Sequence, residues 1–116
     1  MTPASQPAFD LAPERVAELL GSDQVDLIDV REPHERRAGH IGGSRHVPLA
    51  ELTAAAETLD RGRPVVFQCR VGARSGMAAH AFRRAGYDAY NLRGGIVAWA
   101  DRGLPLEPQG GYEADH

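Results

Sequence analysis

Short apolar runs alternate with stretches of helical periodicity along most of this chain of 116 residues, and that alternation limits the possible folds. Three of the runs are compact and rich in β-branched or aromatic residues, which is typical of buried strands. In the stretches between them, apolar residues recur three or four positions apart, as on one face of a helix. The expected strands are VDLIDV at 25–30, PVVFQ at 64–68 and DAYNL at 88–92, with a short extended piece at RHVPL, 45–49.

The sequence also marks the ends of the helical stretches. Pro13 suits a first helical turn, Gly21 ends the same stretch, and Gly86 closes a later one. Each helix is expected to turn an apolar face toward the sheet. The residues expected to face inward are Val16, Leu19 and Leu20; Leu49, Leu52, Ala56 and Leu59; Met77, Ala78, Ala81 and Phe82; and Ile96, Trp99 and Ala100.

Strands that alternate with helices predict an α/β fold, in which helices cover both faces of a parallel sheet. A chain of this length is expected to form one domain. From Leu104 onward the sequence is rich in proline, glycine and charge, so a tail is expected there. In such sheets, ligands bind just beyond the carboxyl ends of the strands, and Cys69 is predicted to lie at that position.

Composition and charge exclude several classes of protein. The net charge is −3, with both signs spread along the chain, so neither a nucleic-acid nor a membrane partner is expected. A single cysteine cannot form an internal disulfide. The first residues do not resemble a signal peptide, and the five histidines lack metal-ligand spacing. We therefore expect a cytoplasmic domain with no metal and no organic cofactor.

The only cysteine, Cys69, lies between a predicted strand and a predicted helix, in the sequence QCRVGARS. The segment RVGA is short enough for a tight turn, in which Gly72 is free to take a positive φ. Backbone N–H groups of such a turn converge on an anion, and the N-terminus of the next helix adds to them. Arg70 and Arg74 contribute positive charge. The pattern predicts a loop that stabilises a thiolate at Cys69 and holds anionic substrates.

Three motifs together resemble the rhodanese family of sulfurtransferases: LIDVREPHERRAGHIGGSRHVP, CRVGARS and NLRGGIVAWADRGLP. The resemblance covers residues 9–105, which leaves 1–8 as an N-terminal extension and 106–116 as a flexible tail. It implies a single domain of the α/β class, with a small, mainly parallel sheet of about five strands and helices on both faces. We expect a monomer, because no exposed apolar stripe is evident.

The same resemblance implies roles for individual residues. Cys69 would take a sulfane sulfur from a donor such as thiosulfate, become a persulfide, and pass the sulfur to cyanide or a thiol. A protein sulfur donor or acceptor is a further option. We also expect Asp29 or Glu32 to pair with an arginine such as Arg74. The residues implied to bind substrate are Arg70, Val71, Gly72, Ala73, Arg74 and Ser75, and the supporting residues are Asp29, Arg31 and Glu32.

Two other functions stay open. Dual-specificity phosphatases and arsenate reductases have a similar fold, but they place five residues between cysteine and arginine, whereas four separate Cys69 from Arg74. The shorter loop suits one sulfur atom better than a tetrahedral oxyanion. A partner-docking or regulatory module is the second alternative, although such domains typically lack the cysteine. Val71 stands where thiosulfate enzymes of the mammalian two-domain type carry a basic residue, so the sequence leaves the natural donor open.

Overall fold

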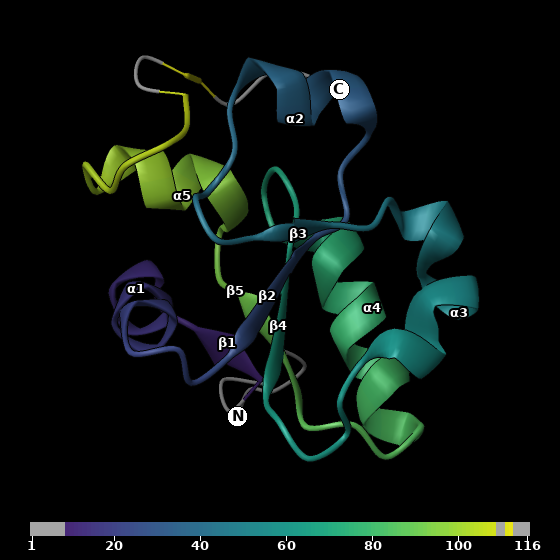
Figure 1. Cartoon of the computed structure of the whole chain (residues 1–116). Helices are drawn as coiled ribbons and strands as arrows, with labels where there is room; N and C mark the ends of the chain where they lie inside the picture. The colour runs from purple at the N-terminus through teal and green to yellow at the C-terminus, as the bar shows by residue number, and fades with distance from the viewer. Residues whose placement is uncertain (1–8, 109–110, 113–116) are drawn as a thin grey trace.

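Five parallel strands form the sheet at the centre of the molecule, in the order β1-β5-β4-β2-β3 (Figure 1). The computed structural model describes residues 9–108 and 111–112. The predicted N-terminal extension at 1–8 therefore lies outside the described residues, as do 109–110 and 113–116 of the predicted tail. The strands are β1 Asp10–Leu11, β2 Asp26–Asp29, β3 Arg45–His46, β4 Val65–Gln68 and β5 Ala89–Leu92.

Helices cover both faces of this sheet, as Figure 1 shows. Helices α1 and α5 lie on one face, α3 and α4 lie on the other, and α2 stands beyond the carboxyl ends of the strands. The predicted α/β class, with a parallel sheet of about five strands and helices on both faces, is therefore confirmed. The helices are α1 Pro13–Gly21, α2 Pro33–Ala38, α3 Leu52–Ala55, α4 Ala73–Arg84 and α5 Gly95–Asp101.

The two central strands, β2 and β4, are neighbours, and every residue of β4 is buried. Phe67 packs into the apolar cluster on the side of α4, and Val66 packs into the cluster on the side of α1 and α5. Because both faces of β4 are covered, its residues 65–67 form a continuous apolar run without the alternation of a half-exposed strand.

The ends of β2 and β4 lie level with each other, since Asp29 pairs in register with Gln68. From there the chain leaves β2 toward β3 and leaves β4 toward β5, in opposite directions along the sheet. Loops that diverge in this way leave a crevice at the carboxyl edge of an α/β sheet. Cys69 directly follows β4, so it lies just beyond the carboxyl end of this strand, as predicted.

The buried face of α4 differs from the expected one. Ala78 and Phe82 are buried as predicted, but the prediction that Met77 and Ala81 face inward is wrong, because both are exposed. The helix begins at Ala73, and the buried Ser75 in its first turn faces the sulfur of Cys69. This contact sets the rotation of the helix, so that Met77 is 67% exposed.

Two other segments are helical in a way that the periodicity did not predict. The stretch expected as one helix from Leu49 to Leu59 is divided into η1 (Leu49–Glu51), α3 and η2 (Ala56–Thr58). The polar stretch after β2 contains α2, which the apolar periodicity does not mark. A capping box starts α2, with Glu32 at the N-cap, Pro33 at the first position and Glu35 at the third. This local pattern was the available signal for the helix.

The segment 104–107, which was expected to begin a tail, packs against the body of the protein. Leu104 and Leu106 contact the apolar cluster that contains Trp99, whose indole N–H donates to the carbonyl of Pro105 at 2.9 Å. Glu107 also exchanges two backbone hydrogen bonds with His40. Apolar residues two positions apart were the overlooked signal for this contact. The domain boundaries at residues 9 and 105 stay predictions.

Candidate active site

The sulfur atom of Cys69 lies within a ring of hydrogen-bond donors. The backbone N–H of Gly72 lies 3.1 Å from Sγ, the backbone N–H of Ser75 lies 3.4 Å away, and the Ser75 hydroxyl lies 3.2 Å away. Cys69 itself is only 1% exposed. Three donors around one buried sulfur stabilise negative charge on it more than they stabilise a neutral thiol.

The loop can close around the sulfur because of Gly72. This residue is the N-cap of α4 and has a φ of +102°, in the left-handed region that favours glycine. The predicted positive φ at Gly72 is therefore confirmed. Its conformation turns the chain so that the Ser75 N–H, in the first turn of α4, points at Sγ. Ser75 belongs to that first turn and is completely buried.

Helix α5 holds the loop from the side of β5. The N–H groups of Ile96 and Val97 donate to the carbonyls of Cys69 and Arg70, at 2.9 and 3.1 Å. Gly95 allows this close approach, because a Cβ at this position would lie 2.4 Å from the Arg70 oxygen and 2.6 Å from the Cys69 oxygen. The adjacent glycine, Gly94, also has a positive φ, of +76°. The glycine pair thus brings the helix against the loop backbone.

Arg74 pairs with Glu35 on the side of α2. Its two terminal nitrogens donate to the two carboxylate oxygens of Glu35, at 2.9 and 3.1 Å. The expectation that Asp29 or Glu32 pairs with an arginine is confirmed for Asp29, which pairs with Arg31, but Arg74 is not that arginine. Glu35 is completely buried, and it reaches Arg74 because α2 stands directly over the start of α4.

The three predicted supporting residues lie beneath or within the capping box of α2. Asp29 accepts hydrogen bonds from the Nε and Nη2 of Arg31, both at 2.9 Å, and both side chains are completely buried. Arg31 also donates to the carbonyl of Gly39 at 2.8 Å. The Glu32 side chain accepts the N–H of Glu35, which fixes the first turn of α2. In this arrangement Asp29 and Arg31 position α2, and through Glu35 they position Arg74.

The pairing determines the ionisation of Glu35 and Arg74. Burial acts to raise the pKa of Glu35, but hydrogen bonds with Arg74 and Glu32 and the charges of Arg74 and Arg31 together lower it below its ordinary 4.5. The hydrogen bonds to Glu35 raise the pKa of Arg74, and burial opposes them with a smaller effect. Both groups are therefore charged at neutral pH, and a thiolate at Cys69 adds a further attraction for Arg74.

Asn91, on β5, completes the site on its other side, and it was not predicted. Its Oδ1 lies 2.6 Å from the Ser75 hydroxyl. Its Nδ2 donates to Asp10 Oδ1 at 3.1 Å and to the Gly72 carbonyl at 3.3 Å. An asparagine inside a buried strand is unusual, and buried polar groups need partners. The position of Asn91 in the expected strand was therefore a signal that the site extends to β5.

The arrangement of strand, cysteine loop and helix has close counterparts. A family model described as "Rhodanese-like domain" matches residues 12–102. The chain belongs to the rhodanese-like domain family. It is 38% identical over 94 residues to a sulfurtransferase of Allochromatium vinosum, with 79% of this chain and 88% of the relative covered. It is also 38% identical over 93 residues to the thiosulfate sulfurtransferase GlpE of Pseudomonas aeruginosa, with 77% and 81% covered.

A solved structure shares the fold of this rhodanese-like domain. The rhodanese-related protein of Thermoplasma volcanium superposes with a TM-score of 0.78 and 28% identity, with 84% of this chain and 95% of that chain covered. Two other relatives are longer: the chain spans 66% of an uncharacterized protein of Bacillus subtilis and 59% of one of Synechocystis. The family and the fold are thus established, and the activity of the whole protein is a matter for proposal.

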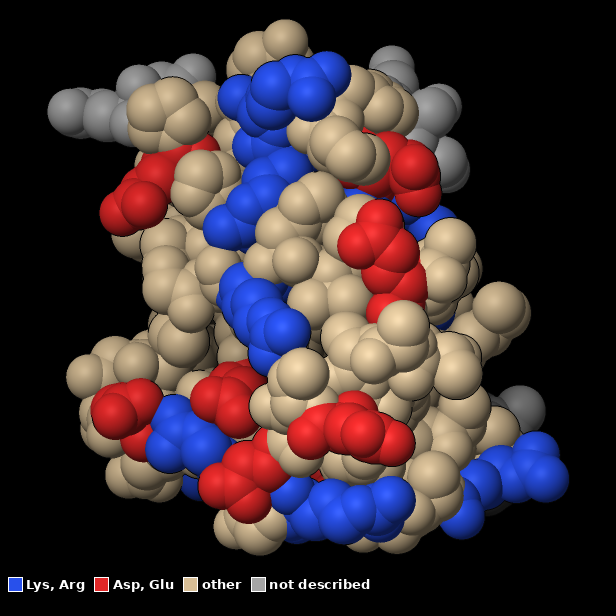
Figure 2. All heavy atoms as spheres, turned by 45° about the vertical axis from the view of Figure 1, so that its right-hand side comes forward, with Lys and Arg blue, Asp and Glu red and all other residues tan. Residues whose placement is uncertain are grey.

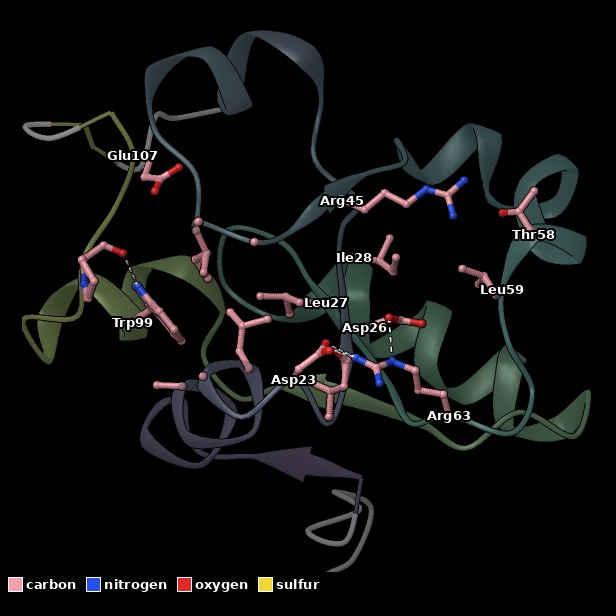
Figure 3. A pocket seen from close by; sticks show the side chains of 18 residues that line it. Asp23, Asp26, Leu27, Ile28, Arg45, Thr58, Leu59, Arg63, Trp99 and Glu107 are labelled. Carbon is pink, nitrogen blue, oxygen red and sulfur yellow. Dashed lines mark hydrogen bonds and ion pairs between the residues drawn. The ribbon is translucent and has the colours of Figure 1, made fainter.

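A groove of about 800 Å³ lies elsewhere in this rhodanese-like domain, along β2 and the end of α1 (Figure 3). Residues 69–75 are not among those that line it. Asp23 and Asp26 in its wall pair with Arg63, at 2.6 and 2.9 Å, as the dashed lines in Figure 3 show. Because these charges are paired with each other, we assign no chemistry to the groove.

On the face drawn in Figure 2, basic and acidic side chains lie next to one another, so that charge of one sign does not cover it. Within the described residues, no three His, Cys, Asp or Glu side chains are grouped so that they could hold a metal ion. Over the same residues, no helix is long and apolar enough to cross a membrane.

Proposed function

We propose that this rhodanese-like domain is a sulfurtransferase that carries a sulfane sulfur on Cys69 as a persulfide. The observation that carries this proposal is the ring of donors on Sγ, formed by Gly72 and Ser75 at 3.1 to 3.4 Å. Such donors favour an anionic sulfur over a neutral thiol. Two relatives at 38% identity are named sulfurtransferases, which supports the same class of reaction.

The transfer takes two displacement steps that balance without a redox partner. In the first step, the thiolate of Cys69 attacks the outer sulfur of thiosulfate. The bond between the two donor sulfurs breaks, sulfite leaves with the electron pair, and Cys69 becomes a persulfide. In the second step, cyanide or a thiol attacks the outer sulfur. The bond between Sγ and that sulfur then breaks, and its electron pair restores the thiolate.

The loop and its supports have separate parts in this reaction. Gly72 and Ser75 donate toward the sulfur, and we propose that the N–H groups of residues 70–75 bind the donor anion and the persulfide. Arg74 adds a positive charge that its pair with Glu35 keeps in place. Asp29, Arg31 and Glu32 are proposed to act as supports, because they hold α2 in the position that Glu35 needs.

The burial of Cys69 favours small reactants. Since this residue is 1% exposed, a donor reaches Sγ only when the surrounding atoms move, and a compact anion needs the smallest movement. Thiosulfate and cyanide satisfy this condition. The natural donor and acceptor, a protein partner and the monomeric state stay predictions.

The pairing of Arg74 weighs against a phosphatase. Arginine recognises a phosphoryl group best with two parallel N–H bonds from its guanidinium. In this domain both terminal nitrogens of Arg74 already donate to the carboxylate of Glu35. A phosphoryl substrate would compete with that carboxylate, whereas a single sulfur atom does not need the arginine fork.

Intact mass measured after incubation with thiosulfate, before and after a cyanide chase, tests the proposal. We expect a gain of about 32 Da, one sulfur atom, that cyanide removes. The Cys69→Ser variant should fold with an unchanged circular dichroism spectrum and should gain no mass.

A mass gain that persists in Cys69→Ser would contradict the proposal, because the sulfur would then be held elsewhere. So would the absence of any gain with thiosulfate, with mercaptopyruvate and with a protein persulfide as donor. The second outcome would favour a docking or regulatory role.

A further inference from the structure

We propose that Asn91 is a positioning residue, which determines whether the Ser75 hydroxyl donates its proton to Cys69 Sγ. The hydroxyl lies between two acceptors, 2.6 Å from Asn91 Oδ1 and 3.2 Å from Sγ. A serine hydroxyl has one proton, so it can donate to only one of them at a time. All three residues are buried, so water does not readily replace either partner.

The contacts of Asn91 fix which end of its amide faces Ser75. Its nitrogen lies 3.1 Å from a carboxylate oxygen of Asp10 and 3.3 Å from the carbonyl oxygen of Gly72. Both of these atoms are acceptors only, so each must face an N–H group. Turning the amide over would bring oxygen against oxygen at both contacts. Asn91 therefore always presents an acceptor, its Oδ1, to the Ser75 hydroxyl.

The hydroxyl proton should follow the charge on the sulfur. When Cys69 is a thiolate, Sγ carries the negative charge and is the stronger acceptor, so the hydroxyl turns toward it. When Cys69 is a persulfide, Sγ is bonded to carbon and sulfur, and the charge resides on the outer sulfur. The hydroxyl then returns to Asn91, 2.6 Å away. Asn91 thus favours the sulfur-loaded form over the free thiolate.

This inference rests on the proposed function only for the loaded form. Asn91 and Sγ already compete for the Ser75 proton when Cys69 carries no extra sulfur. This competition is measurable without any sulfur transfer. The test is the pH dependence of the rate at which iodoacetamide alkylates Cys69, because alkylation follows the thiolate fraction.

We expect Asn91→Leu to shift the midpoint of the alkylation profile down by about one pH unit, since the hydroxyl then has only the sulfur to donate to. Ser75→Ala should shift the midpoint up, because a donor to the thiolate is lost. The double variant should match Ser75→Ala alone. This last comparison is decisive, because a residue that acts through the Ser75 hydroxyl has no effect once the hydroxyl is removed.

Leu92→Val is the matched control. Leu92 neighbours Asn91 on β5, is completely buried and carries no polar group, so this variant should lower the melting temperature and leave the midpoint unchanged. If leucine does not fit at position 91, Asn91→Ala makes the same comparison. The proposal is overturned if the substitution at Asn91 leaves the midpoint at the wild-type value, or shifts it equally with and without the Ser75 hydroxyl.

A second measurement, of the persulfide-to-thiolate ratio, tests the role of Asn91 in sulfur transfer itself. At fixed thiosulfate and sulfite concentrations, the persulfide-to-thiolate ratio of Asn91→Leu should fall about tenfold, which is the same change as one pH unit. An unchanged ratio in a domain that still loads sulfur would contradict the role of Asn91. A domain that loads no sulfur but shows the expected alkylation shifts would contradict the proposed function and leave the role of Asn91 supported.

Discussion

The two sides of the Cys69 loop are built from different kinds of polar group. On the side of α2, the side chains are ionised and pair with one another, as in Asp29 with Arg31 and Glu35 with Arg74. On the side of β5 and α5, amides, a hydroxyl and backbone N–H groups contact the sulfur and the loop carbonyls, and Asp10 supports them from behind through Asn91. The ion pairs hold the scaffold, and Arg74 also attracts a thiolate at Cys69, whereas the backbone and hydroxyl donors that hydrogen-bond to the sulfur are neutral.

Physical chemistry explains this division. A buried ion pair is costly to desolvate and is strongly destabilising when one partner is removed, so it suits a contact that never changes. A neutral hydroxyl can exchange one acceptor for another at little cost, as Ser75 does in our proposal. Substitutions on the α2 side should therefore appear mainly in stability, and polar substitutions on the β5 side should appear mainly in the chemistry of Cys69.

The largest effect is expected for Arg31→Met, on the charged side. It removes the bidentate partner of the completely buried Asp29 and leaves only the longer pair with Arg36, at 3.3 Å, so we expect a loss of about 3 to 4 kcal/mol. Urea unfolding measures this loss. The control is Arg15→Met, which removes an exposed arginine paired with Glu18 and should cost less than about 1 kcal/mol. Equal losses in the two variants would mean that the charged side does not hold the scaffold.

A smaller loss is expected for Gly95→Ala, which tests whether close packing holds the neutral side. The new Cβ would lie 2.4 Å from the Arg70 oxygen, so α5 must move away from the loop. We expect this to cost about 3 kcal/mol and to abolish sulfur loading. Gly103→Ala is the matched control, since Gly103 also has a positive φ but has open space around it, and its cost should be about 1 kcal/mol.

If the two glycine variants lose the same free energy of unfolding, backbone strain alone explains the loss. The hydrogen bonds from Ile96 and Val97 to the loop would then not depend on Gly95. If Gly95→Ala is stable but no longer loads sulfur, the position of the loop, and not the stability of the domain, depends on this contact.

The sequence predicted the parts of the molecule that local patterns determine. The strands are compact apolar runs, so the parallel sheet and the place of Cys69 at its carboxyl edge followed from them. The positive φ of Gly72 followed from the length of the turn. Neither prediction depends on which residues meet in space, and both agree with the structure.

The partners within the site could not be predicted in the same way. Glu35 and Glu32 are both near α2, and only the folded position of α2 over α4 selects Glu35 as the partner of Arg74. Asn91 lies 16 residues after Ser75, and β5 must pair with β4 before the two side chains meet. The sequence predicted the wrong buried face for α4. The polar residue Ser75 lies on the buried face, whereas a pattern of apolar residues places Met77 there.

The smallest loss of unfolding free energy is expected for Glu35→Gln. This variant also separates the charge of Glu35 from its shape. Glutamine keeps the shape but places an NH₂ group against an N–H donor of Arg74, so we expect a loss of about 2 kcal/mol at pH 7. The pKa of Glu35 is lowered in the folded protein. The stability that its ionised form contributes is therefore complete above about pH 4.5 and is lost as the pH falls through the lower, folded value.

The difference in unfolding free energy between the wild-type protein and Glu35→Gln should thus be constant from pH 7 to about pH 5 and should shrink in more acidic solution. Thermal or urea unfolding at a series of pH values measures it. Glu14→Gln removes one partner of the exposed pair with Arg102 and should change stability by less than about 1 kcal/mol at every pH. If Glu35→Gln is as stable as the wild-type protein at pH 7 and in acid, then shape, and not charge, makes Glu35 the partner of Arg74. The two sides of the loop would then differ in packing alone.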